Sequence, residues 1–206
     1  NLQNKSLELC LLLSIPACFG LTIASYEIVN ALFGYGSFTS RDAHLTSLAL
    51  KYFGYGIPAF ALIKILSNLF FARDNTKTPF YLSLVNVSLN ILISVYYFKE
   101  VGFLIIPIAT SVSTWVTVFV YLILLSNKKF LSIKKLPFKN FIKIIFSTIL
   151  MSLALHYALA LFDDKLLYTN NYKFFYVIFV ISLVAAIYLI SCNLLGVLKI
   201  KNYRTN

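Results

Sequence analysis

The sequence predicts an all-α polytopic membrane protein with six transmembrane helices. Hydrophobic residues make up 60% of the 206 residues and charged residues only 12%, whereas about a quarter of an average soluble domain is charged. The mean hydropathy is +0.83. The apolar stretches recur almost to the C-terminus instead of collecting in one signal peptide or anchor. A water-soluble globular domain is therefore excluded.

Six apolar runs are long enough to cross a bilayer, because a hydrocarbon core of about 30 Å requires about 20 helical residues. The predicted spans are residues 7–33, 45–72, 80–98, 102–126, 141–162 and 174–198. Strands of a membrane β-barrel would show about ten alternating residues each, and the run 174–181 does not alternate. Helices are therefore predicted throughout, with no soluble domain between them.

The basic residues predict the orientation, because short cytoplasmic loops carry an excess of Lys and Arg. An N-terminus inside the cell places most of them on the cytoplasmic side: Lys5, Arg73, Lys77, Lys128, Lys129, Lys134, Lys135, Lys139, Lys143, Lys199, Lys201 and Arg204. Only Arg41, Lys99, Lys165 and Lys173 then fall outside. Both ends of the chain are accordingly expected in the cytoplasm.

The net charge of +11 is spread over these membrane-flanking loops. Such a distribution favours contact with anionic phospholipid headgroups and argues against nucleic acid, which would require a concentrated basic face. The chain begins with Asn1 inside an incipient helix, so we expect it to be the C-terminal part of a longer protein.

No enzyme is predicted. The three cysteines, Cys10, Cys18 and Cys192, show no CxxC spacing and are expected to be small apolar side chains without a metal or disulfide. Asp163 and Asp164 are adjacent, and neighbouring positions do not converge on one reacting atom. Nucleophile and phosphate-loop motifs are also absent from the sequence.

Lys64 is the strongest candidate for a functional polar group within a span. An ionisable side chain in the bilayer costs at least about 2.5 kcal/mol on insertion scales and so tends to mark function. With Asn68 on the same helical face, Lys64 could face a central cavity and meet an anionic group. The alternative is that its long side chain reaches back to the cytoplasmic surface.

A second polar group comprises Asn86 and Asn90, spaced one turn apart, and Thr110 in the following span. Residues of this kind most often form hydrogen bonds between helices. A cation or substrate site built from these three side chains is the alternative, and a coupling cation is the only small cofactor that we consider. For His156, in the fifth span, we expect a hydrogen bond between helices.

Helix-disrupting residues interrupt several spans: Pro16 in the first, residues 54–58 (GYGIP) in the second, and Pro107 in the fourth. Transporters use such sites as hinges, although Pro and Gly are also generally more frequent in membrane helices. Both interpretations remain open at this point.

Four segments in the first 80 residues contain recognisable motifs. The sequence reads FGYGSFTSRD at residues 33–42, LKYFGYG at 50–56, KIL at 64–66 and FFARDNTKTP at 70–79. Together these motifs resemble those of the MurJ/MviN family of lipid II flippases. The family shows a Gly-x-Phe-Thr-x-x-Asp loop, a Gly-containing helix with a Lys, and a Phe-Tyr-Ala-x-x-Asp-x-Lys-Thr-Pro turn. This sequence has Phe71 for the Tyr and an additional Asn75. The similarity is strongest over residues 5–115.

The resemblance implies helices nine to fourteen of a fourteen-helix flippase with two lobes around a central cavity. Residues 1–126 would then be part of the C-terminal transport lobe, 127–140 a cytoplasmic basic loop, and 141–206 two additional helices with a short tail. The implied function is alternating-access transport of the undecaprenyl-pyrophosphate-linked peptidoglycan precursor across the bacterial inner membrane. The cell-wall synthesis machinery is an implied partner.

The residues that match the family motifs fall into three groups. They are Gly36, Phe38, Thr39 and Asp42 in an external loop, Lys64 in a helix, and Arg73, Asp74, Lys77, Thr78 and Pro79 at a cytoplasmic turn. Charged residues of this turn could form a gate, and Pro79 is also suited to a helix start.

The alternatives to a lipid II flippase are a polysaccharide-lipid or multidrug exporter of the same superfamily and a membrane scaffold subunit without transport. A polytopic transferase is disfavoured.

Overall fold

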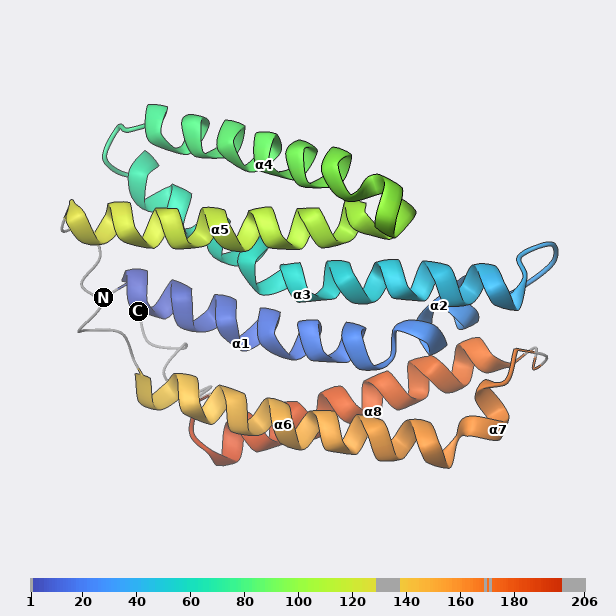
Figure 1. Ribbon diagram of the computed structural model, residues 1–206. Helices are drawn as coiled ribbons and strands as arrows, with labels where there is room; N and C mark the ends of the chain where they lie inside the picture. The colour runs from blue at the N-terminus through green and yellow to red at the C-terminus, as the bar shows by residue number, and fades with distance from the viewer. Residues whose placement is uncertain (1, 129–137, 169, 171, 198–206) are drawn as a thin grey trace. The chain divides into compact units, whose positions relative to one another are not determined.

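The computed structural model describes residues 2–128, 138–168, 170 and 172–197, and all regular elements within these residues are helical (Figure 1). They are α1 (Leu2–Ile23), α2 (Ser25–Phe33), α3 (Ser40–Phe71), α4 (Lys77–Val101), the 3₁₀ turn η1 (Gly102–Leu104), α5 (Ile105–Asn127), α6 (Phe138–Leu161), α7 (Asp163–Leu166) and α8 (Lys173–Leu194). The predicted all-α fold class is confirmed.

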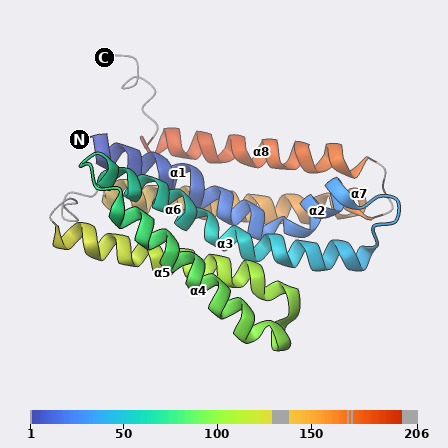
Figure 2. The same cartoon turned by 90° about the horizontal axis from the view of Figure 1, so that it is seen from above.

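Among the residues that the structure describes, five segments are long and apolar enough to cross a membrane: Gln3–Ile23, Ser40–Phe71, Lys77–Asn127, Lys139–Leu161 and Lys173–Leu194. The third segment has 51 residues and contains both α4 and α5, which lie side by side (Figures 1 and 2). Each of these two helices exceeds the length of about 20 residues that one crossing requires. The segments therefore accommodate the six predicted spans.

The first span differs from the prediction of one helix over residues 7–33. Helix α1 ends at Ile23 and α2 begins at Ser25, with Ala24 at φ −97° and ψ 21° between them. By contrast, Pro16 and Pro58 lie inside helices that continue past them. Pro107 lies in the first turn of α5, where its missing N–H breaks no helical hydrogen bond.

The chain folds into two compact units. Unit 1 comprises Asn1–Ser14 and Tyr52–Pro137, and unit 2 comprises Ile15–Lys51 and Phe138–Asn206. The sequence-based division at residues 126 and 140 follows chain order and stays a prediction. Most of its basic loop, and the short tail after residue 197, lie outside the described residues.

Unit 1 is organised around a core of buried apolar side chains from α1, α3, α4 and α5. The fully or almost fully buried members are Leu7, Ala59, Leu66, Leu69, Phe70, Leu82, Val118, Tyr121 and Leu125. The rings of Phe70 and Tyr121 pack at a centroid distance of 5.9 Å. This core fixes α5 against the C-terminal half of α3, the helix that carries Lys64.

In unit 2, α6 and α2 both pack against α8. A smaller apolar cluster of Ala31, Leu166 and Val177 joins α2 to the α7–α8 region. The two helices predicted as a C-terminal addition therefore share a compact unit with α2 and the first part of α3.

Candidate functional site

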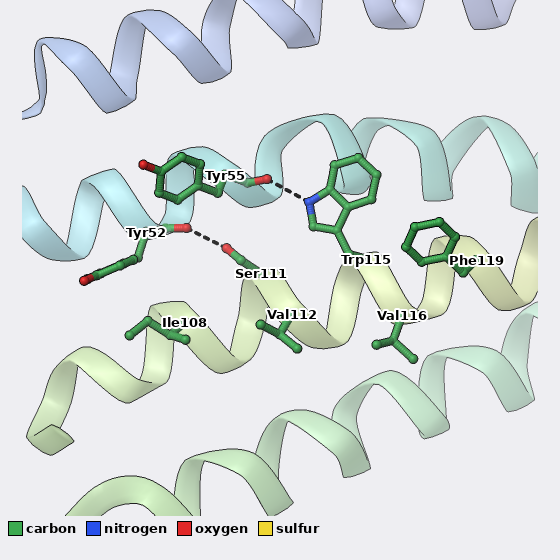
Figure 3. A pocket seen from close by; sticks show the side chains of 8 residues that line it. All are labelled: Tyr52, Tyr55, Ile108, Ser111, Val112, Trp115, Val116 and Phe119. Atoms are coloured by element: carbon green, nitrogen blue, oxygen red, sulfur yellow. Dashed lines mark hydrogen bonds between the residues drawn. The ribbon is translucent and has the colours of Figure 1, made fainter. Parts of the chain in front are cut away.

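Helices α3 and α5 approach each other closely at Gly56. A Cβ atom added there would lie 2.8 Å from the Ser111 Oγ, 2.9 Å from a carbon of the Phe60 ring and 3.4 Å from the Ser111 Cα, so a larger residue would force these neighbours to shift. Ser111 Oγ donates a hydrogen bond of 2.6 Å to the Tyr52 carbonyl, and Trp115 Nε1 donates one of 2.9 Å to the Tyr55 carbonyl (Figure 3). Glycine and two side-chain donors thus hold α5 against the segment around Pro58.

A pocket of about 300 Å³ lies along this contact (Figure 3). It is lined by Tyr52, Tyr55, Ile108, Ser111, Val112, Trp115, Val116 and Phe119, and its surface is almost entirely apolar. The Ser111 hydroxyl and the Trp115 N–H are already used by main-chain carbonyls. The pocket therefore suits hydrocarbon, and a charged headgroup would find no donor among these two groups.

Lys64 and Asn68 lie on one exposed face of α3, together with Phe60 one turn earlier. The Lys64 ammonium forms no hydrogen bond or ion pair with any residue that the structure describes. Its main-chain carbonyl accepts a bond from the Ser67 hydroxyl. The assignment of Lys64 and Asn68 to a substrate cavity stays a prediction.

Asn90 and Thr110 are brought together by the packing of α4 on α5. Asn90 Nδ2 donates a hydrogen bond of 2.8 Å to Thr110 Oγ1, and its Oδ1 accepts one of 3.3 Å from Ser94. Thr110 in turn donates to the Ile106 carbonyl. A direct bond between helices is thus present, while Asn86 lies partly exposed one turn away. The cation site stays a prediction; among the described residues, no three His, Cys, Asp or Glu side chains could share a metal.

The turn between α3 and α4 is a helix-stop structure. Asp74 has φ 55°, and its N–H bonds to the Phe71 carbonyl, while the Asn75 N–H reaches back to the Phe70 carbonyl. These two bonds form a Schellman motif, in which a left-handed residue lets the last helical carbonyls be satisfied. Aspartate tolerates this conformation better than most residues do.

The Asn75 side chain then caps the start of the next helix, because its Oδ1 accepts the Thr78 N–H at 3.1 Å. Lys77 is the first residue of α4, and Pro79 lies buried within its first turn, where proline is tolerated. The Arg73 guanidinium, in the turn after α3, donates to the Leu69 carbonyl in the last turn of that helix. The additional Asn75 is thus explained by capping, and the gate hypothesis stays a prediction.

The loop motif at residues 36–42 caps the other end of α3. Thr39 N–H and Oγ1 donate to Asp42 Oδ2 at 2.9 and 2.7 Å, and the Asp42 N–H donates to Thr39 Oγ1 at 3.2 Å. This reciprocal arrangement is a capping box. Gly36 has φ 63°, a conformation that favours glycine, and the Phe38 ring packs near Phe33.

Sequence reasoning missed the role of Lys173, which it counted only as an external positive charge. Its side chain is 1% exposed, and its ammonium donates to Asn30, Gly34 and Tyr168. No local pattern marks these partners, because two of them are main-chain carbonyls.

The hydrogen bond expected for His156 is not found within the described part of the chain, and its side chain is exposed.

The apolar helical segments, the kinked α3 and the polar groups on α4 and α5 define a polytopic α-helical membrane protein with polar positions inside its spans. A family model described as "Lipid II flippase MurJ" matches residues 1–178. The chain belongs to this family. The match extends beyond the region in which the motifs alone show the resemblance.

Individual relatives agree with this membership. Probable lipid II flippase MurJ of Rickettsia prowazekii is 36% identical over 115 residues, which cover 56% of this chain and 23% of the relative. Probable lipid II flippase MurJ of Buchnera aphidicola from Acyrthosiphon pisum is 28% identical over 200 residues, or 96% of this chain and 39% of the relative. The chain thus spans well under half the length of these curated relatives.

A solved structure, described as lipid II flippase MurJ in an inward closed conformation, resembles the chain with a TM-score of 0.75 and 28% identity. The similarity covers 93% of this chain and 38% of that structure. This structural likeness, at 28% sequence identity, agrees with the family match over residues 1–178.

Proposed function

We propose that the protein is a lipid II flippase of the bacterial cytoplasmic membrane. The observation that carries the proposal is the family match over residues 1–178, supported by the structural likeness to a lipid II flippase over 93% of the chain. The substrate class is a polyprenyl-pyrophosphate-linked peptidoglycan precursor. As a transporter the protein would move this lipid without chemical change.

The proposed role of this chain is to contribute part of a polar path and part of an apolar surface. A pyrophosphate-sugar headgroup is costly to bury in hydrocarbon without partners. Lys64, exposed on α3 with Asn68 beside it, offers a cation and an amide for such a group. The apolar pocket between α3 and α5 suits hydrocarbon only, so we place the headgroup on the Lys64 face instead.

Three further parts of the proposal concern the orientation, the coupling cation and a protein partner. The excess of basic residues in the predicted cytoplasmic loops supports a topology with both ends of this chain on the cytoplasmic side. Anionic phospholipids of that membrane surface would then meet the basic loop at residues 127–140. A coupling cation at Asn86, Asn90 and Thr110 would have only neutral oxygen ligands from these residues. Contact with the cell-wall synthesis machinery would place the substrate close to its site of use.

The test is complementation by the full-length gene in bacteria depleted of their own lipid II flippase. The parent is expected to restore growth and the exposure of lipid II at the outer leaflet. Lys64→Ala should reduce both at equal membrane level, whereas Lys99→Ala, which alters an exposed lysine at the end of α4, should leave both unchanged.

Failure of an expressed, membrane-inserted parent to expose lipid II would contradict the flippase proposal and favour an exporter of another lipid-linked substrate or a scaffold. Rescue by the parent together with full rescue by Lys64→Ala would retain the flippase proposal but remove Lys64 from the substrate path. The two outcomes therefore separate the function from the assigned residue.

A further inference from the structure

The buried ammonium of Lys173 is saturated by neutral oxygens. Lys173 is the first residue of α8, and its Nζ donates to Asn30 Oδ1 at 3.2 Å, the Gly34 carbonyl at 2.6 Å and the Tyr168 carbonyl at 2.8 Å. A lysine ammonium has three N–H donors, and each has an acceptor here. A buried charge requires such complete hydrogen bonding.

Two aromatic rings and one glycine complete the enclosure of this ammonium. Nζ lies 4.4 Å from the centre of the Tyr35 ring and 4.5 Å from that of Tyr168, within the range of cation–π attraction. A Cβ atom on Gly34 would lie 2.9 Å from Nζ and 2.4 Å from Asn30 Oδ1. Gly34 is therefore required for space, since its φ of −70° is open to any residue.

Additional hydrogen bonds run between the same two segments, 30–38 and 166–173. Asn30 Nδ2 donates to the Leu166 carbonyl at 2.9 Å, and the Tyr168 hydroxyl donates to the Phe38 carbonyl. Donors therefore lie on both sides of the contact. Asn30 is 1% exposed and uses its amide for both partners, accepting from Lys173 and donating to Leu166.

We propose that Lys173 and Tyr168 form a permanent clamp that fastens the loop of residues 34–39 to the start of α8. This loop carries Gly36, Phe38 and Thr39 of the family motif. The clamp makes α2, the loop and α8 one rigid body, so that conformational changes during the working cycle occur elsewhere in the protein. Exposed aromatic side chains flank it, among them Phe33, Tyr172 and Phe175.

Hydrogen exchange on the purified full-length protein tests the clamp without reference to any substrate. In Lys173→Met, the amide exchange rate of residues 34–39 should rise at least about tenfold, because local opening loses its main opposing interactions. The control Lys165→Met alters an exposed lysine of α7 and should leave that rate within about twofold.

Tyr168→Phe and Gly34→Ala provide milder and independent disruptions. Tyr168→Phe retains the ring and the carbonyl but removes the bond to Phe38, and exchange in residues 34–39 should rise about two- to fivefold. Gly34→Ala should give a similar or larger rise. If Lys173→Met does not accumulate in the membrane, Tyr168→Phe and Gly34→Ala serve as the test of the clamp. An unchanged amide exchange rate of residues 34–39 in every variant that folds overturns the proposal.

Cross-linking tests whether the clamp is permanent, and this part rests on the proposed flippase function. Ser37 and Leu167 are exposed and flank the contact without taking part in it. Ser37→Cys/Leu167→Cys, joined by a bis-maleimide, should retain lipid II transport at least about half as fast as the single-cysteine controls, because joining groups that already stay together costs a rigid contact little. Loss of transport only in the cross-linked protein overturns permanence, whereas loss in the untreated parent would instead contradict the proposed function.

Discussion

In both units, main-chain carbonyls accept the hydrogen bonds that join segments distant in the sequence, but the donors are neutral side chains in unit 1 and a charged one in unit 2. In unit 1, the neutral groups of Ser111 and Trp115 donate to main-chain carbonyls of α3. In unit 2, a charged ammonium donates to the carbonyls of Gly34 and Tyr168. Removing a neutral donor loses one modest bond, whereas removing the cation deprives several buried oxygens of their only described donor.

The comparison also changes how the lysines of this protein are interpreted. Lys64, which lies about two turns inside the end of an apolar span, is exposed, while Lys173, the first residue of one, is almost fully buried. The sequence position within a span therefore does not indicate which cation is structural. Enclosure by fixed acceptors identifies Lys173 as structural and leaves Lys64 available to a ligand.

The largest expected effect is that of Lys173→Met. It should lower the free energy of unfolding by about 3 kcal/mol, because buried oxygens left without a donor each cost about 1–3 kcal/mol. Lys64→Met should change it by less than about 0.5 kcal/mol, as is usual for an exposed position. Denaturant unfolding of both variants in the same detergent measures the difference, and equal values would remove the contrast between the units.

Gly56→Ala should follow, with a loss of about 1–3 kcal/mol from overpacking against Ser111. The matched control is Gly20→Ala, because a Cβ at Gly20 meets no atom within 4 Å and alanine favours a helix by up to about 1 kcal/mol. Thermal unfolding midpoints should therefore move in opposite directions. A shift of the same sign in both variants would show that the α3–α5 approach is less constrained than the structure indicates.

Thr39→Ala should cost about 1 kcal/mol, the usual value for an N-cap hydroxyl. Thr39 belongs to unit 2, but the donors of its cap, the Thr39 hydroxyl and the Asp42 N–H, are neutral. The loss of stability should therefore resemble that of the neutral hydrogen bonds in unit 1. Thr46→Ala, at an exposed position of the same helix, serves as the control. An effect of Thr39→Ala as large as that of Lys173→Met would instead link the cap to the clamp.

The smallest expected effect is that of Trp115→Phe, which retains a ring in the pocket but removes the bond to the Tyr55 carbonyl. Hydrogen bonds between membrane helices contribute about 0.6 kcal/mol on average. Tyr55→Phe leaves that main-chain acceptor in place and should have no effect on the same bond. Chemical unfolding of the two variants side by side distinguishes them, and a loss above about 2 kcal/mol would indicate that Trp115 does more than this single bond accounts for.

Hydropathy predicted the spans well, because the bilayer imposes both length and composition on a crossing helix. The predicted span 45–72 compares with α3 at Ser40–Phe71, and 174–198 with α8 at Lys173–Leu194. The break after Ile23 could not be foreseen, since neither glycine nor proline lies at Ala24. The structure shows a local capping role for Thr39, Asp42 and Asn75 within the motif segments, and the Thr39-x-x-Asp42 spacing contained that signal.

The contacts of the clamp could not be predicted from the sequence, for a physical reason. Carbonyl acceptors carry no side-chain identity, and the Gly34 oxygen lies 139 residues away from Lys173 along the chain. Only Asn30 among the acceptors has a side chain that a pattern could reveal. The substrate-facing roles of Lys64, Asn68, Asn86 and Asn90 remain predictions for the complementary reason that no ligand contact defines them.

The separation of 139 residues between Gly34 and Lys173 also bears on biosynthesis. At a translation rate of about 5–20 residues per second, the loop emerges about 7–28 seconds before its fastening lysine does. The α4–α5 hairpin, whose helices are joined by only three residues, can pair long before that. A nascent chain therefore passes through a period in which the α4–α5 hairpin can already be paired while the loop of residues 34–39 awaits α8, and during this time that loop lacks the hydrogen bonds of the clamp.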